Sequence, residues 1–92
     1  MNVRFTLDAL AHIDAIDSYI RARSPQAAER IVKRIFVEAD RLSDFSQIGH
    51  AGVVPGTYEW AVTYFPYIIV YEIDADQDEA VVIGVFHGAR DR

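Results

Sequence analysis

The 92-residue sequence contains no cysteine, and its three histidines are far apart. The absence of thiols excludes a disulfide framework and thiolate metal sites, and it fits a reducing compartment such as the cytoplasm. Because no two histidines share a spacing such as H-x-x-x-H, we expect no metal centre, and we expect no cofactor either. The sequence shows no apolar run long enough to span a bilayer and no secretory leader, so we expect neither a signal peptide nor a membrane partner.

Positive charge is scarce in the second half of the sequence. Residues 1–46 contain seven Lys or Arg and seven Asp or Glu, whereas residues 47–92 contain two and seven, which accounts for the whole net charge of −5. Lys and Arg bound to phosphates supply much of the affinity of a protein for nucleic acid. A surface built from the second half is therefore expected to repel RNA and DNA, except near Arg90 and Arg92.

The first half of the sequence predicts a strand followed by two helices. "VRFT" is typical of a short strand, and Thr6 then stands where a helix N-cap belongs, before apolar residues at helical spacing up to about residue 22. Ser24 and Pro25 predict the cap and first residue of a second helix. So short a connection predicts an antiparallel helical hairpin over about residues 7–44.

The second half predicts a β-sheet over about residues 56–87. Gly and Pro residues mark a loop, after which "TYEWAVTYF", "YIIVYEI" and "EAVVIGVF" are rich in β-branched and aromatic residues. We expect an α+β domain in which the N-terminal strand and the helical hairpin pack on a three- to four-stranded antiparallel sheet. At 10.4 kDa the chain is long enough for one hydrophobic core, so we expect a single domain over residues 1–92.

The motifs "FTLDA", "SPQAAERI", "GHAGVVPGTYEW", "PYIIVYEI" and "VFHGARDR" occur in this order along nearly the whole chain. Together they resemble the ParE branch of the RelE/ParE toxin superfamily. The resemblance implies a bacterial, cytoplasmic toxin of a toxin–antitoxin pair. It also implies a ParD-like antitoxin, with a ribbon-helix-helix DNA-binding half and a tail that wraps the toxin, so that the toxin meets DNA only indirectly. Relatives in the ParE branch are associated with poisoning DNA gyrase, and those in the RelE branch with cutting messenger RNA on the ribosome.

Two departures from the RelE pattern favour the gyrase inhibitor over the nuclease. Tyr58 follows Gly-Thr where many relatives have Arg, and His50 stands where many have Gly-Arg, so two cations are missing. RNA cleavage requires an acid, a base and cations that stabilise the phosphate. The nuclease alternative would depend on His87, Arg90 and Tyr71. A relative that binds an antitoxin without being toxic remains a third possibility.

Two groups of residues are candidates for binding. The candidates for the target contact follow the loop or the last strand, and they are His50, Tyr58, Glu59, His87 and Arg90. The candidates for the antitoxin contact form a basic stripe on the second helix, Arg30, Lys33 and Arg34, for which a solvated helix face is the alternative. Alternation along the strand places Trp60 in the core and Glu59 on the opposite face, toward solvent or a partner. His12 is expected to be a solvated helix residue.

Overall fold

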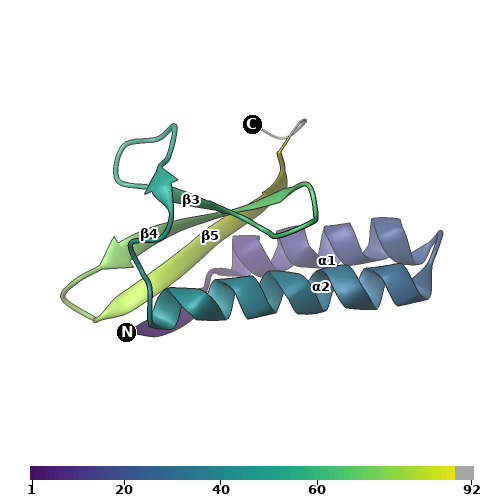
Figure 1. The fold of residues 1–92 in the computed structure, drawn as a ribbon, viewed down its shortest axis with the longest axis horizontal. Helices are drawn as coiled ribbons and strands as arrows, with labels where there is room; N and C mark the ends of the chain where they lie inside the picture. The colour runs from purple at the N-terminus through teal and green to yellow at the C-terminus, as the bar shows by residue number, and fades with distance from the viewer. Residues whose placement is uncertain (89–92) are drawn as a thin grey trace.

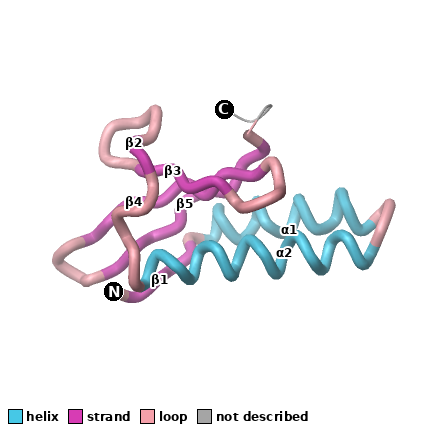
Figure 2. The backbone as a smooth tube through the Cα atoms, viewed as in Figure 1, coloured by secondary structure: helices cyan, strands magenta, loops and turns pink. Residues whose placement is uncertain are grey.

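The computed structural model describes residues 1–88 and arranges them as two helices packed against a sheet (Figures 1 and 2). Arg90 and Arg92 lie outside the described residues. The elements, in chain order, are β1 (Asn2–Phe5), α1 (Leu7–Arg21), α2 (Pro25–Asp40), a 3-10 turn (Arg41–Ser43), β2 (His50–Ala51), β3 (Tyr58–Ala61), β4 (Tyr67–Asp74) and β5 (Glu79–His87). This is the α+β class that the sequence predicted.

Both helices begin at the caps that the sequence predicted. The Thr6 hydroxyl accepts a hydrogen bond from the backbone N–H of Ala9, and the Ser24 hydroxyl accepts one from Ala27. Each cap satisfies a backbone donor that the first helical turn leaves without a partner. The helices lie side by side as an antiparallel hairpin (Figure 1).

The sheet has five strands within the described residues, in the order β1-β5-β4-β3-β2. β1 pairs parallel with β5 in the register Asn2↔Glu79, and the other pairs are antiparallel. The sheet is therefore mixed, and it has more strands than the three or four antiparallel strands expected. The last strand, β5, lies beside the first strand, β1. The two residues of β2 form the other edge of the sheet, beside β3.

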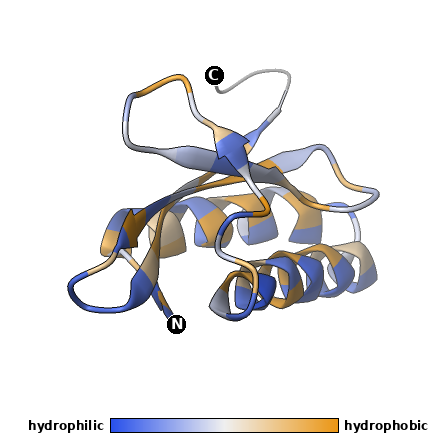
Figure 3. Cartoon of the chain, turned by 60° about the vertical axis from the view of Figure 1, so that its left-hand side comes forward, coloured by the Kyte–Doolittle hydropathy of each residue, from blue (hydrophilic) through white to orange (hydrophobic). Residues whose placement is uncertain are grey.

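The helices cover one face of the sheet and form the hydrophobic core with it. Ile35 and Ala39 from α2 and Ala9 from α1 are fully buried there with sheet residues such as Ile69 and Val82. Apolar colour gathers on the surfaces between the two layers (Figure 3). Neither helix of residues 1–88 covers the opposite face of the sheet, called the outer face below (Figure 1). No helix in residues 1–88 is long and apolar enough to cross a membrane.

Candidate functional site

The outer face of the sheet contains a groove of about 420 Å³ beneath the loop that joins β2 and β3. Figures 1 and 2 show this loop standing over the face that the helices do not cover. Its lining is mostly apolar and comes from the loop and from β3, β4 and β5: Val53, Val54, Thr57, Glu59, Val70, Glu72, Ile83 and Phe86. We call this the outer groove.

Internal hydrogen bonds hold the loop in its position over the sheet. The Thr57 hydroxyl donates to the carbonyl oxygen of Val54 at 2.6 Å, and the N–H of Gly52 donates to the carbonyl oxygen of Thr57 at 2.8 Å. A side chain at Gly52 would collide with the Thr57 hydroxyl, so this close approach requires glycine. The loop therefore forms one wall of a preformed groove, with the side chains of Val53 and Val54 exposed.

Glu59 lies on the outer face as predicted, but the expectation that it meets solvent is wrong. The residue is 4% exposed, because the loop before β3 folds back over it. One carboxylate oxygen, Oε2, lies 3.4 Å from the N–H of Val53, and the other, Oε1, lies 3.7 Å from Nε2 of His50. The His50 side chain itself is exposed, and it forms an ion pair with Glu59 only when its ring is protonated. The structure thus brings two target-contact candidates together.

Tyr58 and Tyr71 belong to the core side of the sheet. Their rings stack with centroids 5.5 Å apart, and Tyr71 is completely buried. The Tyr71 hydroxyl donates to the carbonyl oxygen of Ser46 at 2.8 Å and accepts from the N–H of Gly49 at 3.0 Å. Burial raises the pKa of Tyr71, and the Gly49 hydrogen bond offsets this only in part. The structure therefore places the Tyr71 hydroxyl in the core, bound to two backbone groups, rather than on a surface open to a substrate.

His87 ends β5 and does not line the outer groove, although its neighbour Phe86 lines both that groove and the hollow that contains His87. His87 pairs with Tyr67, whereas Glu59 pairs with Val70, three residues farther along β4. Its half-buried ring meets the Tyr67 ring edge to face, with centroids 5.6 Å apart. His87 lines a second hollow of about 490 Å³ between α1 and β5. The target-contact candidates are therefore divided between two places.

His12 also lines this second hollow, and the expectation of a solvated residue is wrong. It is half-buried, its ring lies 4.8 Å from that of Phe86, and Nδ1 accepts the N–H of Val85 at 3.3 Å. β1 pairs with β5 only as far as Val82. The histidine thus satisfies a backbone donor of β5 beyond the end of β1, a contact across 73 residues that helical periodicity cannot show.

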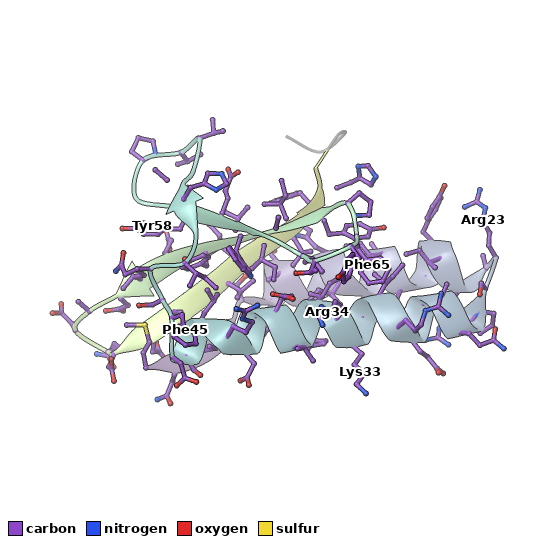
Figure 4. The ribbon with its side chains drawn as sticks, in the orientation of Figure 1. Arg23, Lys33, Arg34, Phe45, Tyr58 and Phe65 are labelled. Carbon is purple, nitrogen blue, oxygen red and sulfur yellow. The ribbon has the colours of Figure 1, made fainter. Side chains whose placement is uncertain are left out.

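The basic stripe on α2 is interrupted at Arg34. Figure 4 shows Lys33 pointing away from the sheet and Arg34 toward it. Arg34 forms an ion pair with Glu38, a fully buried carboxylate that also accepts the indole N–H of Trp60 at 3.0 Å and lies 3.5 Å from Arg41. Burial favours the neutral acid, but the hydrogen bonds from Trp60 and Thr63 and the charge of Arg34 outweigh it, so the pKa of Glu38 is lowered. The ion pair therefore holds Arg34 against the fold, whereas Arg30 and Lys33 of the stripe are exposed, and the antitoxin contact of Arg34 stays a prediction.

The chemistry of the outer groove suits a protein segment better than a phosphate. Its lining includes two carboxylates, Glu59 and Glu72, and neither Lys nor Arg from residues 1–88. No group of three or more potential metal ligands occurs in the same residues. A phosphate in this groove would meet negative charge with no metal or side-chain cation to offset it.

Comparison of sequences identifies relatives along nearly the whole chain. Residues 3–92 match the family described as "ParE toxin of type II toxin-antitoxin system, parDE". Y4kP of Sinorhizobium fredii, a protein named as a toxin, is 37% identical over 81 residues, which are 88% of this chain and 84% of that protein. Toxin RelE2 of Caulobacter vibrioides is 34% identical over 89 residues, which are 96% of either chain.

Solved structures share the fold at lower sequence identity. A chain of the chromosomal ParDE system from P. aeruginosa superposes with a TM-score of 0.76 at 22% identity, with 95% of each chain covered. A chain of the intact E. coli RelBE toxin-antitoxin complex gives a TM-score of 0.61 at 18% identity and covers 97% of this chain and 98% of that one. These two likenesses establish the fold, and the sequence matches establish the family. The chain belongs to the ParE toxin family of type II toxin–antitoxin systems.

Proposed function

We propose that this toxin inhibits DNA gyrase and is neutralised by a ParD-like antitoxin, whose ribbon-helix-helix half provides the only, indirect contact with DNA. The observation that carries the proposal is the lining of the outer groove, which is apolar and acidic. Such a surface favours contact with a protein, whether target or antitoxin, and opposes the contact with phosphate that a nuclease requires. The family match supports a ParD-like antitoxin, and an action on gyrase implies a protein of the bacterial cytoplasm.

The buried tyrosine argues against a nuclease mechanism. Cutting RNA requires groups that transfer protons and cations that stabilise the growing charge on the phosphate. Of the three residues that could supply them, Tyr71 is buried, His87 packs against Tyr67, and Arg90 lies outside the described residues. An inhibitor that acts by binding has no such requirements, so the proposed toxin is not an enzyme.

An exposed apolar surface on α2 is the proposed contact for the antitoxin. Phe36 and Val37 are 40% and 44% exposed, and they line a hollow of about 570 Å³ beside β1 together with Lys33 and Asp40. Exposed apolar side chains suit an amphipathic segment, and the exposed cations Arg30 and Lys33 favour acidic residues beside its apolar face. This assignment retains Lys33 as an antitoxin contact, with Arg30 one helical turn before it, and an interface of at least about 1,000 Å² is expected.

The experiment that separates gyrase inhibition from RNA cleavage begins with expression of the chain without its antitoxin. A gyrase inhibitor should make cells filament with a DNA-damage response, whereas a nuclease should stop translation. Purified protein should then inhibit supercoiling by gyrase and leave message on ribosomes intact. Cleaved message with unimpaired gyrase would overturn the proposal, and a chain that binds antitoxin without arresting growth would be the non-toxic relative. Co-expression with the antitoxin is the matched control and should restore growth.

A further inference from the structure

The outer groove exposes apolar side chains on a loop whose backbone is already ordered. Val53 and Val54 are 81% and 62% exposed, although hydrogen bonds from Thr57 and Gly52 fix the loop that carries them. Figure 3 shows apolar colour in this loop, standing clear of the sheet. Because the groove is preformed, a partner would bind without paying the entropy of ordering the loop. Apolar residues held open in this way are typical of a contact surface.

The charge of the groove selects the kind of partner. Residues 47–88 include six Asp or Glu and neither Lys nor Arg, and Glu59 and Glu72 lie in the groove itself. Glu59 is buried at its floor, where solvent screens a charge less than at an exposed position. The field therefore favours a cation, and the apolar walls favour hydrophobic side chains on either side of it.

We propose that the outer groove binds an extended segment of the antitoxin in which apolar side chains flank a Lys or Arg, and that Glu59 receives the cation. This inference rests on the proposed function, because it assumes an antitoxin. The groove would be a second antitoxin contact besides the one on α2. The groove contact would require a Lys or Arg in the antitoxin segment. The volume of about 420 Å³ accommodates a few side chains of such a segment.

The test measures the affinity of the purified cognate antitoxin for variants of the toxin. Glu59→Gln keeps the size of the side chain and an oxygen for the Val53 N–H, but it removes the charge. We expect antitoxin affinity to fall on the order of tenfold to a hundredfold, because a buried charge pair loses one partner. Asp76→Asn is the matched control, because Asp76 is exposed in the turn between β4 and β5 and does not line the groove, and the expected change is less than about threefold.

A second variant keeps the inference testable if Glu59→Gln folds poorly. Val53→Ser changes an exposed loop side chain, so it should weaken antitoxin binding on the order of threefold to tenfold and leave the melting temperature unchanged. Replacing the single Lys or Arg of the antitoxin segment by Met should reproduce the loss seen with Glu59→Gln, and the two changes together should cost little more than either one.

The outcomes separate this inference from the proposed function. Unchanged antitoxin affinity in both Glu59→Gln and Val53→Ser would overturn the groove assignment while leaving the toxin and its antitoxin in place. Weaker inhibition of gyrase with unchanged antitoxin affinity would also overturn it, because the groove would then belong to the target. Binding of single-stranded RNA that Glu59→Gln strengthens would overturn the choice of a cationic protein segment. A wild-type chain that bound no antitoxin would overturn the proposed function itself.

Discussion

Replacing Tyr71 by Phe should weaken the fold and leave the toxin's chemistry untouched. The change removes one oxygen atom and leaves the aromatic ring packed in the core. That oxygen bridges two backbone groups, the carbonyl of Ser46 and the N–H of Gly49, and so ties the segment before β2 to the middle of β4. Both groups would lose a partner inside the protein.

The size of the effect follows from the two hydrogen bonds. Each is worth about 1 kcal/mol net, with a further cost if a backbone group stays buried without a partner, so a loss of about 2 kcal/mol is expected. In a domain of 92 residues this lowers the melting temperature by ~10 °C. Thermal and urea unfolding followed by circular dichroism would measure the loss. Tyr58→Phe, which alters the half-buried ring stacked on Tyr71, is the matched control and should cost less than about 1 kcal/mol.

Growth arrest decides between a structural and a catalytic hydroxyl. At a temperature where the Tyr71→Phe variant remains folded, the structural role predicts nearly full toxicity. A variant of wild-type stability whose toxicity has fallen a hundredfold would refute the reasoning and restore Tyr71 to the nuclease alternative.

Three further predictions test two contacts between the helices and the sheet side and one strained turn. The pKa of Glu38 is lowered in the folded state, so the contribution of its charge to stability is complete above the ordinary pKa of 4.5 and is lost as the pH falls through the folded value. Glu38→Gln should therefore lose less stability in acid than the wild type. Curves of unfolding free energy against pH that run parallel for the two proteins would contradict this. Tyr64 has a φ of 71° and is 94% exposed, so Tyr64→Gly should raise stability by up to about 1 kcal/mol, and a lower melting temperature would contradict the strain. His12→Ala leaves the Val85 N–H without its acceptor and should lower the free energy of unfolding by about 1 to 3 kcal/mol, measured by urea unfolding. An unchanged free energy of unfolding would contradict this and would indicate that water replaces the ring as acceptor.

Local signals predicted the first half of the fold well. Thr6, Ser24 and Pro25 determine the starts of the helices through caps formed within three residues, so the sequence around them contains the necessary information. The strand over "TYEWAVTYF" was predicted too long, because β3 ends at Ala61 and a turn with Tyr64 at positive φ follows. A glycine at this position would have predicted a left-handed backbone, whereas a tyrosine does not. The resemblance to ParE toxins is confirmed by the family match.

Long-range contacts explain the predictions that failed. Alternation placed Glu59 on the correct face, but only the returning loop makes it buried. Arg34 looked like one member of a solvated stripe, but it pairs with Glu38, which also accepts hydrogen bonds from Trp60 of β3 and from Thr63 of the turn after β3. These partners are more than 20 residues away, beyond the reach of periodicity. The binding roles proposed for the candidates remain predictions: His50, Tyr58, Glu59, His87 and Arg90 for the target, and Arg30, Lys33 and Arg34 for the antitoxin.

The positions of the Lys and Arg side chains further favour a toxin that acts by binding a protein over one that cleaves RNA. Of the seven Lys and Arg in residues 1–46, four are in ion pairs within the described structure: Arg4, Arg21, Arg34 and Arg41. Arg23 lies over the Tyr19 ring at 4.5 Å, and Arg30 and Lys33 lie on α2. The cations still available for phosphate are therefore on the helical layer, while the outer groove is acidic. Because RNA cleavage needs cations and proton-transfer groups around one phosphate, a nuclease site on the outer face would have to draw its side-chain cations from residues 90 and 92.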